Sequence, residues 1–376
     1  MPQVAKGLEG IVAGTTALSL IEGRGGRLIY SGYDINDLAA KSTYEEVCYL
    51  LWYGRLPNRS QLADLVHEFQ AMRALPSPLL RLLRDLPPGA HPLEALRTVI
   101  SPLRGFDENP DDESPAANLK RAKLLTVVTS TIVAAFHRVR QGKEPIAPRP
   151  DLTHAANFLY MLTGKAPAPL HEKASDTYYI LLAEHGYNAS TFTARVIAST
   201  LSDMYSAISG AIGALKGPLH GGAAQSTMEM LLRIGSVDRV APYVNGLFEQ
   251  KRKVPGFGHR VYKVEDPRAR ILRRLSHQLA EKTDGLIWFE ISEGVDALVA
   301  QLRGTKEIYP NVDFYSASLL HNLGISTDLM TPLFACSRMA GWTAHVIEQQ
   351  SDNRLIRPES EYTGRTDLTY IPLDER

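Results

Sequence analysis

The chain has 376 residues, of which 44% are hydrophobic and 22% charged, and its 41 basic and 41 acidic residues cancel. This composition is that of an ordinary globular protein and excludes disorder as the main state, while the balanced charge argues against a global electrostatic grip on nucleic acid or on an anionic membrane. A chain of this length forms one large domain or two.

The first predicted element is a β-hairpin between about Thr16 and Tyr33. Two runs of β-forming residues flank the turn Gly23-Arg24-Gly25-Gly26. Such a glycine-rich turn between two short runs is typical of an antiparallel pair.

Helical patterns dominate the rest of the chain, because apolar residues recur there at three- and four-residue spacing. The predicted helices are Tyr44–Gly54, Gln61–Met72, Leu93–Ile100, Ala117–Val139, Thr153–Leu162, Ser190–Leu215, Gln225–Ile234, Val240–Lys251, Asp266–Lys282, Ile291–Leu302 and Thr331–Gln349. The acidic segment Phe106–Pro115 and the proline-rich segment Gly142–Pro150 are expected to be exposed loops. No alternation of strands and helices is visible, so we expect a mainly α fold and no parallel-sheet nucleotide-binding fold.

No motif for a nucleotide or a metal is present. The chain has no G-x-x-x-x-G-K-[ST] loop, and Gly256-Phe257-Gly258 lacks the third glycine of G-x-G-x-x-G. The eleven histidines form no H-E-x-x-H pair, and the acidic residues form no calcium-loop pattern. We therefore expect no essential metal.

The two cysteines, Cys48 and Cys336, are too few for a disulfide framework or a cysteine-based zinc site. The opening MPQVAKGLEG contains no apolar signal core, so we expect the reducing cytoplasm as the location. The longest apolar stretch, near Leu124 to Phe136, is interrupted by threonines and a serine and is shorter than the ~20 residues of a bilayer span. No membrane passage is predicted.

Two histidines stand in glycine frames, His220 in G-P-L-H-G-G-A and His259 in G-F-G-H-R. Glycines leave an imidazole open to a small molecule, so two such frames close together indicate an active site. His220 precedes a predicted helix, whose dipole disfavours imidazolium, and it is expected to be a neutral hydrogen-bond donor that suits a carbonyl becoming an enolate. A capping or packing histidine is the alternative.

Asp313 lies among apolar and aromatic residues in P-N-V-D-F-Y-S-A. Partial burial there would raise its pKa and make it a better general base, whereas the alternative is a helix N-cap. Three arginines, Arg268, Arg338 and Arg357, would together suit a small di- or tricarboxylate, because guanidinium groups bind carboxylates in a fork. Taken singly, each arginine is more often a surface charge.

The runs EHGYNAS (184–190), GPLHGGA (217–223), VPGFGHRVYK (254–263) with DPR, PNVDFYS (310–316) and RLIRP (354–358) resemble the citrate synthase family in order and spacing. The resemblance extends from Gly7-Leu8-Glu9-Gly10 almost to the C-terminus. Members of that family join acetyl-CoA to oxaloacetate and hydrolyse the thioester to citrate and CoA, without a metal or redox cofactor.

The resemblance implies a role for each catalytic residue. His220 would polarise the thioester carbonyl while Asp313 removes a methyl proton, and His259 would protonate the ketone oxygen of oxaloacetate. The positions implied to bind oxaloacetate are His185, Asn188, Arg268, Arg338 and Arg357, the last reaching across a homodimer interface to the partner's site. The positions implied to bind CoA are Val254, Pro255, Gly256, Phe257, Gly258, Lys263 and Lys306.

The resemblance also implies a two-domain helical architecture. Residues 1–217 and 321–376 would form a large domain and residues 218–320 a small one, with a hinge near Gly217-Pro218 that closes over oxaloacetate and excludes water. Because the chain starts almost at the family core, a dimer without regulation by NADH is expected.

Two alternatives stay open. A 2-methylcitrate synthase would use propionyl-CoA with the same catalytic residues, since one methyl group in an apolar pocket is worth only about 1–3 kcal/mol. A catalytically silent helical scaffold or metabolite-binding dimer would be expected to have lost His220, His259 or Asp313, and all three are present.

Overall fold

The computed structural model describes residues 5–376 and contains, over that range, sixteen α-helices and one three-stranded sheet. The mainly α class with an N-terminal hairpin is therefore confirmed. The first four residues of the predicted large domain lie outside the described residues.

The hairpin pairs β1 (Ser19–Glu22) with β2 (Arg27–Tyr30) in antiparallel register, and β2 also pairs with β3 (Tyr33–Asp34). The third strand was not predicted, since two residues leave no periodic signal. Tyr30 is fully buried, and its hydroxyl donates to the carbonyl oxygen of Glu184 at 2.8 Å. The hairpin is thus fastened to the chain directly before His185.

The helices follow in chain order. They are α1 (Ile35–Lys41), α2 (Tyr44–Tyr53), α3 (Arg59–Met72), α4 (Ser77–Asp85), α5 (Pro92–Ile100), α6 (Pro115–Val139), α7 (His154–Thr163), α8 (Pro169–Leu182), α9 (Ala189–Ser199), α10 (Met204–Leu215), α11 (Ala223–Ile234), α12 (Val240–Glu249), α13 (Pro267–Ala280), α14 (Leu286–Leu302), α15 (Val312–Asn322) and α16 (Met330–Ser351). Short 3-10 helices are η1 (Lys6–Leu8), η2 (Ser101–Phe106), η3 (Val237–Arg239), η4 (Thr327–Leu329) and η5 (Leu373–Glu375).

The single predicted helix Ser190–Leu215 is wrong, because the chain breaks there into α9 and α10. Leu201 takes a left-handed φ of 64°, and the Asp203 side chain then caps α10 by accepting a hydrogen bond from Ser206 N. Leucine rarely adopts that conformation, so a leucine at this position does not indicate a break in the helix. The helical spacing of apolar residues continues through the turn between α9 and α10, which is why one helix was predicted.

Four helices, α1, α4, α8 and α15, escaped prediction. Helix α8 is buried at every residue from 174 to 182, and α15 at every residue from 314 to 320. A helix buried all round loses the alternation of apolar and polar faces on which the prediction rests. Helices α1 and α4 are short, with seven and nine residues.

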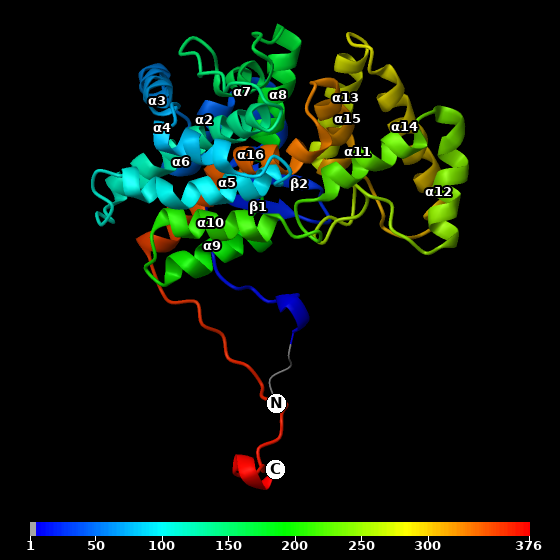
Figure 1. The fold of residues 1–376 in the computed structure, drawn as a ribbon. Helices are drawn as coiled ribbons and strands as arrows, with labels where there is room; N and C mark the ends of the chain where they lie inside the picture. Colours follow the sequence, from blue (N-terminus) through cyan, green and yellow to red (C-terminus); the bar gives the residue numbers. More distant parts are fainter. Residues whose placement is uncertain (1–4) are drawn as a thin grey trace.

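Helices α11 to α15 gather at one side of the molecule, and the other helices form the larger body around α16 (Figure 1). Helix α16 packs against α6, α8, α9 and α2 and is buried at every residue from 330 to 346. It is the central helix of the larger body. The domain boundaries at residues 217 and 321 stay a prediction.

Helix α6 has 25 residues, and its bounds agree with the predicted helix Ala117–Val139 to within two residues at the start. Among residues 5–376 it is the one helix long and apolar enough to cross a membrane, yet 78% of its most apolar window is buried inside the fold. Its apolar surface packs against the protein's own helices, α16 and α5 among them.

Candidate active site

Six of the side chains singled out in the sequence converge although they come from six segments. They are His185, His220, His259, Arg268, Asp313 and Arg338. The His185 and His259 rings lie 5.2 Å apart between centroids. The charges of Arg268 and Arg338 act on both Asp313 and His185, and Arg338 also acts on His220. The fold therefore brings three imidazoles, two guanidiniums and one carboxylate into one place.

The imidazole of His220 lies against the N-terminus of α9. Its hydrogen bonds are to that helix and not to α11, the helix that follows it in the chain. Its Nε2 lies 3.3 Å from Ser190 N and 2.7 Å from Ser190 Oγ. Because a backbone N–H can only donate, Nε2 accepts, and the proton of the neutral ring is on Nδ1. Burial, followed by the Arg338 guanidinium, lowers the pKa of His220 to about 4. The expected neutral state thus has a different main cause from the α11 dipole.

His259 has the opposite tautomer. Its Nδ1 accepts hydrogen bonds from Val261 N at 3.0 Å and Tyr262 N at 3.1 Å, which places the ring proton on Nε2. Burial and the neighbouring Arg268 lower the pKa of His259 to about 4. Both glycine-framed histidines are therefore neutral donors near pH 7.

The loop before His259 is bound to the segment before α15. Gly258 N donates to Tyr309 O at 2.8 Å, and Asn311 N donates to Gly256 O at 2.9 Å. Gly256 has a φ of 77°, and a Cβ there would lie 2.8 Å from Thr227 Oγ1 and about as close to the Phe314 ring. Only glycine fits this position without movement of its neighbours, so the loop and α15 approach closely.

Asp313 lies in the first turn of α15, but it does not cap the helix. The cap is Asn311, whose side chain accepts a hydrogen bond from Asp313 N at 3.0 Å. No donor among residues 5–376 reaches the Asp313 carboxylate, and burial raises its pKa to about 6 despite the positive charge of Arg268. The carboxylate is thus free to accept a proton.

The two arginines differ in how they are held. Arg268 makes a two-point ion pair with Asp266, through Nε at 3.0 Å and Nη2 at 2.7 Å, and both side chains are buried. Arg338 donates through Nε to Leu182 O at 2.6 Å and stacks over Phe334 at 4.7 Å. Within residues 5–376, Nη1 of Arg268 and both Nη groups of Arg338 make no hydrogen bond. Those groups could bind carboxylates.

His185 supplies a buried polar atom without a partner. Within the described range, its Nε2 is buried and makes no hydrogen bond. Burial, and then the charge of Arg268, lower the pKa of His185 well below its usual value. The adjacent Glu184 fixes the backbone, because its Oε1 accepts from Ser19 Oγ and from Gly186 N. A buried donor or acceptor of this kind fits a polar ligand.

Asn188 lies near this cluster but is engaged in capping α9. Its Oδ1 accepts from Thr191 N at 3.1 Å and lies 2.8 Å from Ser190 Oγ. Its Nδ2 donates to neighbouring oxygens, including Thr191 Oγ1 at 3.0 Å. The predicted contact of Asn188 with oxaloacetate stays a prediction.

The remaining predicted residues lie at the margin. Val254 is buried, whereas Lys263 and Lys306 are exposed, although the charge of Lys263 acts on the pKa of His259. Arg357 is exposed in the tail after α16 and makes no ion pair or hydrogen bond within residues 5–376. Within residues 5–376, Arg357 therefore makes no hydrogen bond or ion pair with the clustered site residues of its own chain.

The sequence predicts no role for Ser190, Phe334 or Trp342, yet all three contact site residues. The Phe334 and His220 rings are 6.3 Å apart between centroids, and Trp342 Nε1 donates to Ser190 Oγ at 3.1 Å. Phe334, Arg338 and Trp342 succeed one another at four-residue steps on α16. That spacing was the one available signal, since residues so spaced share a helix face.

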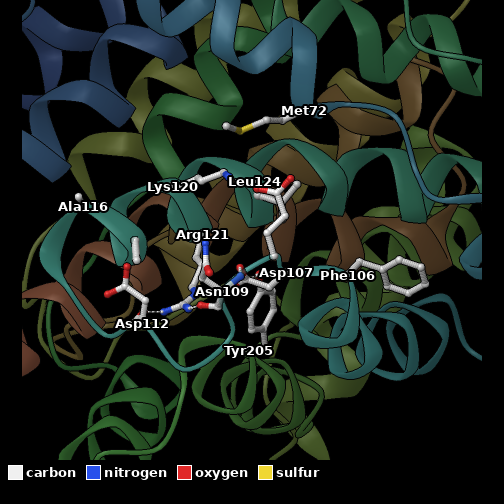
Figure 2. A pocket seen from close by; sticks show the side chains of 12 residues that line it. Met72, Phe106, Asp107, Asn109, Asp112, Ala116, Lys120, Arg121, Leu124 and Tyr205 are labelled. Atoms are coloured by element: carbon white, nitrogen blue, oxygen red, sulfur yellow. Dashed lines mark hydrogen bonds and ion pairs between the residues drawn. The ribbon is translucent and has the colours of Figure 1, made fainter.

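A cavity of about 420 Å³ lies elsewhere, between η2, α6 and α10 (Figure 2). There the buried Arg121 binds Asp107 Oδ2 at 2.7 Å and the carbonyl oxygens of Asn109 and Asp112. The predicted loop Phe106–Pro115 is therefore exposed only in part. None of the predicted site residues lines this cavity. No group of three metal-binding side chains occurs within residues 5–376, and the absence of an essential cofactor stays a prediction.

Comparisons with known proteins agree on one family. The family model described as "Citrate synthase, C-terminal domain" matches residues 7–359. The chain is 46% identical to citrate synthase of Deinococcus radiodurans over the full length of both, and 47% identical to citrate synthase 2 of Bacillus subtilis over 99% of each. It is also 42% identical to 2-methylcitrate synthase of Shewanella oneidensis, over 98% of this chain and 97% of that one.

Among solved structures, a citrate synthase of Thermoplasma acidophilum in ternary complex with carboxymethyl coenzyme A and oxaloacetate superposes with a TM-score of 0.95. The two sequences are 32% identical, and the match covers the whole of both chains.

Proposed function

The chain belongs to the citrate synthase family, an enzyme family of acyltransferases, and from that premise we propose that it condenses acetyl-CoA with oxaloacetate and hydrolyses the product to citrate and CoA. One observation carries the proposal most directly. An Asp313 carboxylate without a hydrogen-bond donor shares a cluster with two neutral histidines, of which His220 carries its proton on Nδ1 and His259 on Nε2.

The first step forms an enol or enolate from acetyl-CoA. Asp313 takes a proton from the methyl carbon, and its pKa of about 6 makes it a stronger base than an exposed aspartate while it remains ionised near pH 7. The Nδ1–H of His220 donates to the thioester oxygen, where negative charge develops. A neutral donor is suited to this task because its acidity is closer to that of an enol.

In the second step the enolic carbon attacks the ketone carbon of oxaloacetate. The Nε2–H of His259 donates to the ketone oxygen and protonates it as the C–C bond forms, and the proton that Asp313 took from the methyl group then restores the neutral ring. The carboxylates of oxaloacetate are bound by the unpaired N–H groups of Arg268 and Arg338, with His185 Nε2 as a further polar contact. In the third step water attacks the thioester carbonyl, and the C–S bond breaks to release CoA and citrate.

CoA would bind along the loop 254–258, with Lys263 and Lys306 near its phosphates. The left-handed glycines Gly256 and Gly258 give this loop a fixed shape beside His259. Closure of residues 218–320 over the larger body, with a hinge near Gly217-Pro218, would exclude water during condensation. Identical conformations with and without oxaloacetate would contradict this closure.

A homodimer would complete the site. The tail from residue 352 leaves the body beside α9, where Ile356 N donates to Ser199 Oγ, and then runs away from the fold (Figure 1). Apolar side chains on it are largely exposed, with Tyr370 at 79% and Leu373 at 74%. A second copy that covered the tail would remove this apolar surface from water and receive Arg357 near its own site. The two buried free cysteines suit the proposed cytoplasmic location.

Release of CoA thiol tests the proposal against the silent scaffold. The purified protein should release CoA only when acetyl-CoA and oxaloacetate are both present, and it should bind oxaloacetate without acetyl-CoA. No thiol release by protein that binds oxaloacetate would favour the scaffold. Relatives named 2-methylcitrate synthase also match the chain, and propionyl-CoA in the same assay tests that alternative.

A further inference from the structure

Helix α16 reaches the proposed active site through two residues one turn apart. Arg338 faces the cluster directly, whereas Trp342 is fully buried and touches it through one intermediate. Its indole Nε1 lies 3.1 Å from Ser190 Oγ, and that oxygen lies 2.7 Å from Nε2 of His220. A single hydroxyl group thus connects the indole to the imidazole.

The direction of these hydrogen bonds follows from the chemistry of each group. An indole N–H can only donate, so Ser190 Oγ accepts from Trp342. The hydroxyl proton then has two acceptors within reach, Asn188 Oδ1 at 2.8 Å and His220 Nε2 at 2.7 Å. Asn188 Oδ1 already accepts from Thr191 N. His220 Nε2 has a donor in Ser190 N, at the longer distance of 3.3 Å.

We propose that Trp342 is a positioning residue for His220: its indole N–H holds the Ser190 hydroxyl so that the hydroxyl donates to His220 Nε2, which strengthens His220 Nδ1–H as a donor to the thioester oxygen. This inference rests on the proposed function and deepens it. Trp342 touches no substrate in this scheme, and its effect passes entirely through Ser190.

The physical basis is cooperativity along a chain of hydrogen bonds. Each donor polarises the next, and the effect is larger in a buried site than in water. As the enolate oxygen draws on Nδ1–H, electron density grows on Nε2 of the same ring. A hydroxyl proton that already points to Nε2, rather than to Asn188 Oδ1, stabilises that density as it develops.

Burial of Trp342 by itself would give only a structural role, and the same helix offers a matched comparison. Trp52 Nε1 donates to Thr343 Oγ1 at 3.0 Å, and Thr343 is the residue next to Trp342 on α16. Each tryptophan therefore donates to a single hydroxyl, the buried Trp342 to that of Ser190 and the half-buried Trp52 to that of Thr343. Thr343 makes no hydrogen bond to the clustered histidines, and its own hydroxyl donates within α16.

The test compares Trp342→Phe with Trp52→Phe, each of which keeps an aromatic ring and removes the donor. Steady-state kinetics of CoA release give kcat and KM, and calorimetry gives the affinity for oxaloacetate. Enolisation is measured separately, as incorporation of solvent deuterium into the methyl group of acetyl-CoA with 2-hydroxysuccinate in place of oxaloacetate. That analogue has no ketone for the enolate to attack, so exchange reports the first step alone.

Trp342→Phe should lower kcat and the exchange rate in the same proportion, by roughly two- to tenfold, the effect of one lost hydrogen bond. The affinity for oxaloacetate should stay as in the wild type, and Trp52→Phe should leave exchange unchanged. Equal exchange rates in Trp342→Phe and the wild type would overturn the inference, as would an equal loss in both variants.

Ser190→Ala keeps the tryptophan and the backbone donor and removes only the connecting hydroxyl, so it tests the inference even where Trp342→Phe fails to fold. It should reproduce the loss of exchange, and the double variant should lose no more than either single one. Ser190→Ala with wild-type exchange, or additive losses in the double variant, would contradict a path through Ser190. A wild-type protein that releases no CoA would instead refute the proposed function itself.

Discussion

The imidazole rings of His185 and His259 meet nearly edge to face, with centroids 5.2 Å apart and an interplanar angle of 76°. Burial and the guanidinium of Arg268 lower the pKa of both rings, so neither carries a charge near pH 7. Two neutral histidines can lie this close without repulsion. In the proposed site, the positive charge available to a dicarboxylate is therefore that of Arg268 and Arg338.

Replacement of Asp313 by Asn should remove the base and preserve the shape of the site. We expect kcat to fall by about 100- to 10,000-fold, the range for loss of a general base, with the affinity for oxaloacetate nearly unchanged. CoA release and calorimetry measure the two quantities. Near-normal turnover would remove Asp313 from the role of base.

The rate of CoA release should fall at acidic pH, because a single proton binds to the Asp313 carboxylate. Asp313 must be ionised to act, and its pKa of about 6 lies above that of an ordinary aspartate, so kcat/KM should fall by about tenfold for each pH unit below that value. The pKa values of His220 and His259, about 4, place no further loss between pH 5 and 8. A flat profile down to pH 4.5 would show that Asp313 has no raised pKa.

Gly256→Ala should change the conformation of the loop before His259, an effect beyond the backbone strain that any alanine with positive φ causes. Gly256 and Gly324 both have positive φ, but only at Gly256 would a Cβ collide with neighbours, Thr227 and Phe314. We expect Gly324→Ala to lower the free energy of unfolding by about 1–2 kcal/mol, the cost of a left-handed alanine, with KM for acetyl-CoA unchanged. Gly256→Ala should also raise that KM. Equal KM values for the two variants would argue against a CoA-binding role of this loop.

Mixing of two inactive variants tests the proposed exchange of Arg357 between subunits. Arg357→Ala and Asp313→Asn should each be nearly inactive alone. After joint refolding at equal amounts, half of the dimers pair one chain of each kind, and one of their two sites is intact, so about a quarter of wild-type activity should return. If Arg357 served its own chain, the mixture would stay inactive.

The sequence predicted the local elements well where their faces alternate. The hairpin at residues 19–30 and amphipathic helices such as α11 carry a periodic signal that survives in the fold. Helices α8 and α15 do not, since they are buried on all sides. The break between α9 and α10 depends on the backbone of Leu201, which its side chain does not disclose.

Residues of the candidate site could be predicted from sequence motifs. The hydrogen-bond partners of those residues could not, because they depend on contacts between helices. The neutral state of His220 was expected from a helix dipole, but the contact at its Nε2 comes from α9, a helix distant in sequence. The capping alternative for Asp313 fails because Asn311, two residues earlier, caps α15. The contact of Trp342 with the site depends on the packing of α16 beside Ser190, which the sequence does not show.

The most direct test of the central claim is the ratio of kcat/KM for acetyl-CoA to that for propionyl-CoA, measured by CoA release with saturating oxaloacetate and with the product identified by mass. We predict that the ratio exceeds one, that citrate forms in amounts equal to the CoA released, and that release stops when oxaloacetate is omitted. A ratio clearly below one, with methylcitrate as the preferred product, would contradict the assignment, and so would an absence of CoA release with either thioester.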